Sequence, residues 1–351
     1  MANETTSAWA GAVTGRHLAP PYYADFMISR LYGHLYNRQL GTLITIPRGR
    51  GSKVRISRWQ SPVVSVGGTM QVTSTSAVGF LTEGTSPTNV PLSSESITGE
   101  VTAWGGSRGY TDKLVIVSMA DFLEGALDSL SRELAFKIDR YIRAKISGTA
   151  FTVYGVSPAG AKPTANKVPG TNVLFGKNVA RIKPLMAANG CPTWDDGTYV
   201  GTAHDLAQYD MMVDSSASGF ISTARYNNAR QIFRGEIGEF YGVRWLLSNA
   251  SNQRIYGAAG NTATFGLSPA VTGSNAFIFS PDAFYNLELE TGGVEVVHQP
   301  LGSAGTADQL AQRGSIGVKV HFGVLPGPNP GGGVTTNRRL MRFVHATSLG
   351  Y

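Results

Sequence analysis

The chain has 351 residues, of which 42% are hydrophobic and only 15% are charged, and 43 are glycine. That hydrophobic fraction is enough for a packed core and excludes wholesale disorder, and the length leaves room for two ordinary domains or one body with large excursions. Abundant glycine with plentiful Ser, Thr and Val favours strands, tight turns and long loops over a helical protein.

The cellular compartment of the protein is indicated by features that its sequence lacks. The single cysteine, Cys191, excludes a disulfide within the chain and a thiolate metal cluster, and it favours a reducing environment. The N-terminus has no basic stretch followed by an apolar run, and no window approaches the roughly 18 apolar residues that a membrane-spanning helix needs. We therefore expect a soluble protein made in a cytoplasm, with no membrane partner.

The net charge of +7 is concentrated near the N-terminus, because residues 1–60 carry eight Lys and Arg against Glu4 and Asp25. This asymmetry suggests an arm that meets nucleic acid or an acidic surface of a neighbouring subunit, although a solvated basic face gives the same count. Residues 1–20 are small and polar and read as a mobile arm. Residues 22–40 fit a short amphipathic helix with an aromatic face that another subunit would cover. Its aromatic residues are Tyr22, Tyr23, Phe26, Tyr32 and Tyr36.

Residues 43–59 look like two strand pieces around a glycine turn, with basic side chains alternating in the second piece. Residues 61–100 contain scarcely a positive charge, and the alternation near residues 94–106 predicts a returning strand. A basic strand going out and a neutral-to-acidic strand coming back are typical of an extended two-stranded flap. Such a ribbon is marginal in water by itself, so we expect it to lie on something else.

The spacing predicts one long helix over residues 118–147, about 45 Å long. Its apolar residues recur in steps of three and four and form one stripe. They are Leu123, Leu127, Leu130, Leu134, Ile138 and Tyr141. Ser118 and Asp121 form a capping-box pattern at its start, and Gly148 stands where a left-handed cap would end it. The run 111–117 before it is strand-like.

The remaining chain alternates short elements. Residues 149–173 read as a loop, 178–190 as a short helix, 195–212 as strand, turn and helix, 243–248 as a strand, 276–289 as a buried strand followed by a short helix, and 315–325 and 338–348 as two closing strands. The closing strands are joined by a loop rich in Pro, Gly and Asn.

No candidate for catalysis survives inspection. Gly105–Gly109 matches the G-x-S-x-G pattern, but a nucleophile elbow needs a helix directly after it, so we interpret the motif as a glycine turn. The six histidines never recur at i, i+3 or i, i+4, which excludes a helical metal pair. Glycines around residues 170–178 fail the phosphate-loop pattern. We predict no catalytic, cofactor-binding or metal-ligating residue, and no cofactor.

Several separated motifs together resemble a known family. They are an EG-x-x-P loop at Glu83–Pro87, a step at Tyr110–Asp112, Ile138–Asp139 in the long helix, a glycine-rich segment at Gly235–Ala250, and the closing strands from Ser315. In this order they resemble the major capsid proteins of tailed bacteriophages, in particular the coat-protein family named for coliphage N-four. The likeness spans about residues 20–347.

The resemblance implies an α+β protein with the Hong Kong 97-type phage capsid fold. Its parts would be an N-terminal arm (1–45), an extended loop (46–110), a peripheral domain (111–189) with the spine helix 118–147, an axial domain (190–310), and closing strands of the peripheral domain (311–351). It further implies a non-enzymatic coat protein that assembles into pentamers and hexamers of an icosahedral head enclosing double-stranded DNA. The protein would be assembled in the host cytoplasm and reside in the virion. Partners would be itself, a portal protein, scaffolding and decoration proteins, and packaged DNA.

We expect the flap to lie across a neighbouring subunit. The residues expected at intersubunit contacts are Arg48, Arg50, Lys53, Arg55 and Arg58, their possible partners Glu83, Glu95 and Glu100, and the five aromatic residues between Tyr22 and Tyr36. The basic region is equally compatible with phosphate contacts to DNA. Two alternatives are a non-viral nanocompartment shell of the same fold and a small DNA-binding oligomer.

Overall fold

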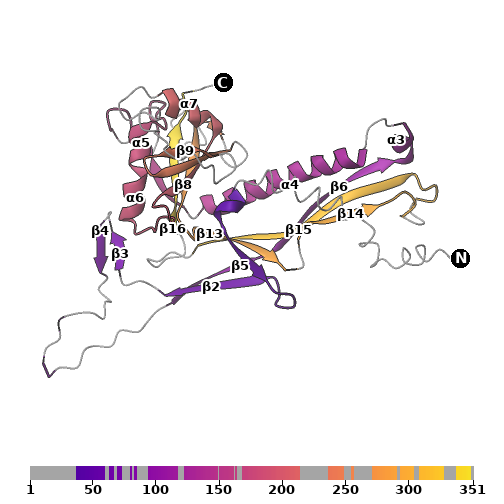
Figure 1. The fold of residues 1–351 in the computed structure, drawn as a ribbon, viewed down its shortest axis with the longest axis horizontal. Coiled ribbons are helices and arrows are strands. Elements are labelled where there is room, and N and C mark those ends of the chain that lie inside the picture. The colour runs from indigo at the N-terminus through magenta and orange to yellow at the C-terminus, as the bar shows by residue number, and fades with distance from the viewer. Residues whose placement is uncertain are drawn as a thin grey trace.

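The computed structural model describes residues 37–59, 63–66, 69–72, 80, 83–84, 94–117, 122–148, 150–161, 163, 168–213, 236–248, 254–256, 271–290, 293–303, 308–327 and 337–348. Figure 1 shows a long helix over an extended sheet at one end, a lobe of sheet and short helices at the other, and a two-stranded ribbon below them. It is a strand-rich α+β structure, as predicted.

The extended sheet, here called sheet I, is organised around its longest strand. It consists of β1 (Thr42–Ile46), β6 (Thr102–Thr111), β13 (Phe284–Leu289), β14 (Glu295–Gln299) and β15 (Arg313–Pro326). The strand order is β1-β13-β15-β14, and β6 pairs with β15 as well. The pairings with β15 are antiparallel, whereas β1 runs parallel to β13. Each ladder of sheet I therefore includes β15 or its neighbour β13.

The predicted long helix is confirmed as α4 (Phe122–Ser147). The four central residues of the predicted stripe are buried, and Leu123 and Tyr141 pack at its margins. The stripe meets alternate residues of β15, which point to the helix because side chains alternate along a strand. These residues are Ile316, Val318, Val320, Phe322 and Val324. The predicted cap at Ser118 and Asp121 lies outside the described residues, and the left-handed cap is wrong because Gly148 does not have positive φ.

The strand predicted over residues 111–117 is wrong, because the structure has a short helix there, α3 (Asp112–Val117). The β-branched run gave a strand-like pattern. Thr111 ends β6 instead, and its Oγ1 accepts a hydrogen bond from the Leu114 N–H at 3.4 Å, in the manner of a helix N-cap. The local cap therefore prevails over the propensity of the side chains that follow it.

The lobe contains a second sheet, sheet II, with short helices on one face. Its strands are β7 (Ala150–Tyr154), β8 (Tyr199–Ala203), β9 (Glu236–Phe240), β10 (Val243–Leu247), β11 (Arg254–Tyr256), β12 (Thr272–Phe279) and β16 (Asn337–Ala346), in the order β7-β16-β12-β8-β10-β9 with β11 beside β12. The helices are α5 (Gly176–Ala180), α6 (Ile182–Ala188) and α7 (Asp205–Val213). They pack on Tyr199, Trp245 and Phe343. The opposite face of sheet II, with Phe277 and Phe279, joins the core beneath α4.

Most of the predicted lobe elements are confirmed. The helix expected at 178–190 is α5 and α6, the strand-turn-helix at 195–212 is β8 and α7, and the strand at 243–248 is β10. Two predictions are wrong. The loop expected at 149–173 contains β7, which is held by a parallel ladder to the distant β16. The short helix expected at the end of residues 276–289 is instead the strand β13, which pairs on both sides. In both cases pairing with distant segments prevails over the local pattern.

The two sheets do not follow contiguous ranges of the chain. Residues 280–283 carry the chain from β12 in sheet II to β13 in sheet I. The closing strands, both expected in the peripheral domain, lie in different sheets, because β15 belongs to sheet I and β16 is a central strand of sheet II. Residues of β16 are buried on both of its faces, which requires a central position covered on both sides.

The predicted two-stranded ribbon is confirmed by β2 (Lys53–Trp59) and β5 (Ser94–Glu100). They pair antiparallel from Lys53 opposite Glu100 to Trp59 opposite Ser94. A second small hairpin joins β3 (Val63–Val66) to β4 (Thr69–Val72). Within the described chain the 3-10 helix η2 (Asn37–Leu40) comes first. The amphipathic helix expected at 22–40, with its five aromatic residues, lies almost wholly outside the described residues.

A buried histidine in β16 is held in one neutral tautomer. His345 Nδ1 lies 2.9 Å from the carbonyl oxygen of Ala346, and Nε2 lies 3.1 Å from Ser274 Oγ. Because a carbonyl oxygen can only accept, Nδ1 carries the hydrogen and Nε2 accepts from the Ser274 hydroxyl. Burial lowers the pKa of His345 to about 4, the Ala346 contact opposes this shift, and the charge of His204 adds to it.

The free energy of unfolding should therefore fall as the pH is lowered from about 6.5 to about 4, because His345 is protonated in the unfolded chain before it is protonated in the folded one. The expected loss from this group is on the order of 3 kcal/mol. His345→Gln should remove this pH-dependent part of the free energy of unfolding. Any remaining change in that free energy should be the same at every pH. Urea unfolding of both proteins between pH 4 and 8 measures it, and parallel pH profiles would contradict it.

The buried face of α4, which includes Ile142 and Ile146 in addition to the predicted stripe, should dominate the stability of the protein. Ile142 is fully buried, so Ile142→Ala should lower the free energy of unfolding by about 2–5 kcal/mol through lost burial and a residual cavity. Phe136 on the same helix is 44% exposed, and Phe136→Ala should cost well under half as much. Urea unfolding of the two variants compares these losses, and similar losses would show that the buried face of α4 is not the main source of stability.

Candidate interaction surfaces

The inner face of the ribbon lies on sheet I of the same chain. Val54 and Ile56 of β2 and Ile97 of β5 pack on Leu287 and Leu325. Two glycines permit the close approach. A Cβ added at Gly99 would lie 2.8 Å from Leu287 Cδ1, and one added at Gly323 would lie 2.5 Å from the carbonyl oxygen of Glu100. The base of the ribbon is thereby fixed to the body of the subunit.

The outer face of the ribbon is charged. Lys53, Arg55 and Glu100 are exposed, and the turn before β2 exposes Arg48 and Arg50. The backbone N–H of Arg48 donates to Glu290 Oε2 at 3.1 Å, so this hydrogen bond does not involve the guanidinium group. These predicted contact residues therefore gather around one end of β2. Beyond them Trp59, 64% exposed, ends the strand.

The register also juxtaposes opposite charges within one chain. Lys53 stands opposite Glu100, and Arg58 stands opposite Glu95, at the two ends of the β2–β5 ladder. Directly opposite positions of unlike charge stabilise an antiparallel pair. The side chains of Arg58 and Glu95 lie outside the described residues, as do the five aromatic residues near the N-terminus. Glu83 is exposed and is not part of this ladder.

A second exposed surface escaped the sequence analysis. All six residues of α3 lack burial, and the helix exposes four consecutive apolar side chains, Leu114 to Val117, with Ile116 81% exposed. Leu310 is 77% exposed, and the backbone of the segment beside it contacts α3, where the Asp112 N–H donates to the Gln312 carbonyl at 3.1 Å. The apolar run 114–117 is visible in the sequence, but its exposure was not expected because the run was predicted to be strand-like.

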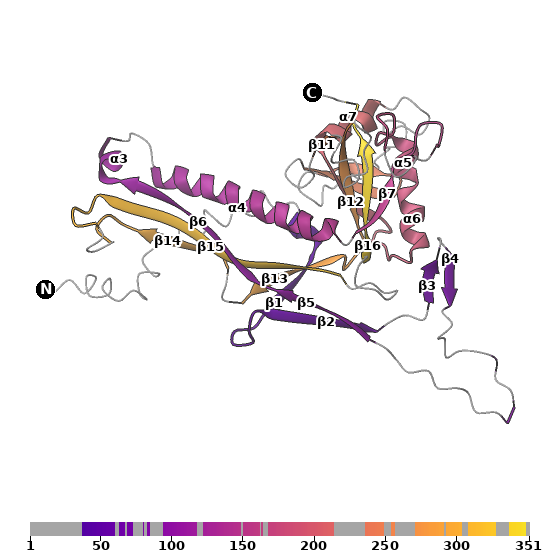
Figure 2. The ribbon, with the colours of Figure 1, turned by 180° about the vertical axis from the view of Figure 1, so that it is seen from behind.

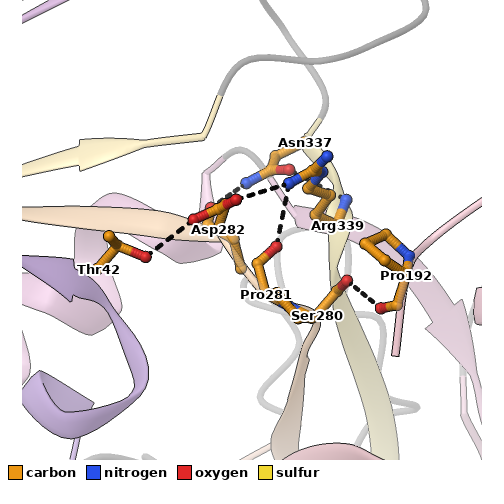
Figure 3. A network of polar contacts seen from close by, with 8 residues as sticks. Thr42, Pro192, Ser280, Pro281, Asp282, Asn337 and Arg339 are labelled. Carbon is orange, nitrogen blue, oxygen red and sulfur yellow. Dashed lines mark hydrogen bonds and ion pairs between the residues drawn. The ribbon is translucent and has the colours of Figure 1, made fainter. Parts of the chain in front are cut away.

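The junction between the two sheets is a polar network (Figure 3). Asp282, in the left-handed conformation with φ of 56°, accepts hydrogen bonds from Thr42 of β1 at 3.0 Å and from Arg339 of β16 at 3.3 Å. Arg339 also donates to the Pro281 carbonyl at 3.2 Å, and Asn337 donates to the Ala283 carbonyl at 2.5 Å. One turn thus joins a strand of sheet I to a strand of sheet II.

Two further contacts close the junction. Ser280 Oγ donates to the Pro192 carbonyl at 2.5 Å, and Cys191 Sγ donates to the Arg338 carbonyl at 2.9 Å. Burial raises the pKa of the Cys191 thiol to about 12, so it remains protonated and is a structural donor rather than a nucleophile. On the other side, Arg38 of η2 pairs with Glu288 of β13 at 2.5 Å.

The remaining polar groups of the described residues do not form a reaction centre. Tyr110 Oη lies 2.8 Å from His298 Nε2 beside an open groove, and burial lowers the pKa of His298 and raises that of Tyr110. Gly105–Gly109, interpreted above as a glycine turn, is part of strand β6 instead. No cluster of three or more His, Cys, Asp or Glu residues suited to a metal occurs in the described part of the chain. Among the helices of the same residues, none is long and apolar enough to span a membrane.

Comparison with known proteins agrees with the fold. The chain is similar to the capsid of Ralstonia phage GP4, with 12% identity, 88% of this chain and 87% of that chain covered, and a TM-score of 0.59. The cyanophage Pam1 capsid has 14% identity, with 91% of this chain and 93% of that chain covered and a TM-score of 0.58. The head of Helicobacter pylori bacteriophage KHP40 has 10% identity, with 91% of this chain and 90% of that chain covered and a TM-score of 0.57. At these identities the likeness shows the fold. No curated protein sequence matches the chain.

The sequence itself matches one family model, that of phage capsid proteins, over residues 94–336. The matched range begins with the returning strand of the ribbon and includes α4, all of sheet I except β1, and all of the lobe's strands and helices except β16. It covers well over half of the chain. The family is a class of structural proteins rather than enzymes, which agrees with the sequence analysis. This chain belongs to the phage capsid protein family.

Proposed function

We propose that this chain is the major capsid protein of a tailed bacteriophage, with a Hong Kong 97-type fold, and that it assembles into the pentamers and hexamers of an icosahedral head around double-stranded DNA. The observation that carries the proposal is a family match together with a ribbon that projects from the body and exposes its charged face and Trp59. The protein would assemble in the host cytoplasm and reside in the virion, as the resemblance to the coat-protein family of coliphage N-four implies.

The proposed parts correspond to features of the structure. Residues 46–110 would be the extended loop, with β2 and β5 as its base, and α4 would be the spine helix of a peripheral domain built on sheet I. The lobe would be the axial domain, and residues 1–45 the arm. The Asp282 junction would hold peripheral and axial parts in one orientation, so that each subunit enters the shell with a defined shape.

We propose that assembly uses the ribbon as the contact between subunits. Arg48, Arg50, Lys53 and Arg55 would meet carboxylates of a neighbour, and Trp59 would be buried there. Exposed ion pairs contribute little singly and are screened by salt, so the aromatic anchor and the combined charge would matter more than any one pair. Such contacts join unlike surfaces and form rings when the rotation closes.

Other partners would be a portal protein, scaffolding and decoration proteins, and the packaged DNA. Contacts to DNA would be to phosphate, without sequence preference and strongly salt-dependent. The basic segment from Arg48 to Arg58 supplies charge for either partner.

Charge reversal tests the ribbon contact. The triple variant Arg48→Glu, Arg50→Glu and Arg55→Glu should remain folded, because these side chains are exposed, but should form shells at less than about a tenth of the normal yield. The matched control changes the same residues to Lys, which preserves the charge. Electron microscopy and size-exclusion chromatography measure yield, and circular dichroism reports folding. Normal shell yield from the glutamate variant would refute the contact.

A further inference from the structure

We propose that the outer edge of β6 binds an extended strand of a second copy of this chain, so that sheet I continues across a subunit boundary. The inference rests on the proposed function, because it needs a second copy held at a fixed position. It concerns a surface distinct from the charged ribbon, and it depends on main-chain hydrogen bonds rather than on side-chain charge.

The edge is long and continuous. All ten residues of β6 pair in unbroken register with β15, from Thr102 opposite Phe322 to Thr111 opposite Arg313. In an antiparallel ladder about half of the N–H and C=O groups of a strand with a single partner point away from it. Among the described residues, β15 is the only strand that pairs with β6. The other edge strands described in the two sheets are shorter, with five residues or fewer.

The usual protections of an edge are missing from this strand. Monomeric proteins block long edges with proline, bulges or outward charges. Residues 102–111 contain no proline, and the ladder has no bulge. The one charged residue, Arg108, is paired with Glu133 of α4 at 3.0 Å and so is directed to the helix. Gly105, Gly106 and Gly109 leave the backbone uncovered.

The long helix covers a face of β6 and not its edge. Trp104 packs against Tyr141 of α4 in a tilted arrangement with ring centroids 4.9 Å apart, and Arg108 reaches the same helix. The apolar side chains of β15 and Val296 of β14 also belong to the core under α4, which places the helix over the middle of the sheet. In Figures 1 and 2, β6 runs beneath α4 beside β15. The approach from the side is therefore open within the described structure.

The occupant we infer is a second copy, because the family is one whose members form capsids and a shell brings identical edges to identical places in every subunit. Five of the ten residues of β6 are Gly, Ser or Ala, which impose few side-chain requirements, so an extended segment of the chain itself would fit. An exposed ten-residue edge left uncovered would promote aggregation of the subunit, whereas pairing in the shell satisfies it.

Hydrogen exchange with residue-level mass spectrometry tests this directly on purified particles and on subunits dissociated from them. Amides of β6 that face β15 should be protected in both forms. The alternate amides should exchange at least about tenfold more slowly in the particles than in the subunits. Equal exchange of β6 in the two forms would overturn the inference while leaving the proposed function standing. A chain that forms no particle at all would overturn both.

Proline substitutions at adjacent positions provide a matched test. Because neighbouring N–H groups of a strand point in opposite directions, one of Gly106→Pro and Ser107→Pro removes an outward donor and the other removes a bond to β15. The variant that loses the outward donor should preserve the urea midpoint of the subunit but lower particle yield at least about tenfold. The variant that loses a bond to β15 should destabilise the subunit. Gly106→Ala and Ser107→Ala keep both donors and should assemble normally. A stable proline variant with normal yield would overturn the inference, and if both prolines unfold the subunit, hydrogen exchange decides.

Discussion

The packing of α4 on alternate residues of β15 is the constraint on which the rest of the structure depends. The helix stripe from Leu127 to Ile146 and the apolar residues of β15 bury one another, and both β6 and β14 are held by their ladders to β15. The same core receives Phe277 and Phe279 of sheet II, so the helix also fixes how the lobe meets the extended sheet. Loss of this contact would affect both sheets at once.

Three features outside this core, on the ribbon, α3 and β6, are rarely left exposed by monomeric proteins. The ribbon presents its charged face and Trp59, α3 presents four apolar side chains, and β6 presents an edge that no described strand covers. Each is costly or hazardous in isolation, through exposed apolar area or unpaired backbone groups. They lie on different elements of the described structure, in which the Asp282 junction joins sheet I to the lobe. The repeated contact with identical neighbours proposed above would account for all three without requiring any chemistry.

The sequence was a good guide to elements with strong local patterns and a poor one where distant pairing decides. The α4 stripe, β8, α7 and both closing strands were recognisable because their apolar residues recur at helical or strand spacing. Phe284–Leu289 and residues 150–154 were misassigned, because their strands exist through ladders to β1, β15 and β16. For the candidate surfaces, the basic cluster from Arg48 to Arg55 was found from charge alone, whereas the edge of β6 and the exposure of α3 were not.

By itself, the sequence determined the α+β class, the long helix, the ribbon and, through its motifs, the family, because each is encoded in local periodicity, charge or spacing. Only the tertiary structure decided which strands share a sheet, that β16 leaves the sheet of β15, and that Lys53 faces Glu100 within one chain. It also decided which backbone groups of β6 have no partner in the described fold. The physical reason is that strand pairing is a non-local interaction between backbones, and the backbone is the same for every residue, so the pattern of side chains along one segment does not name its partner.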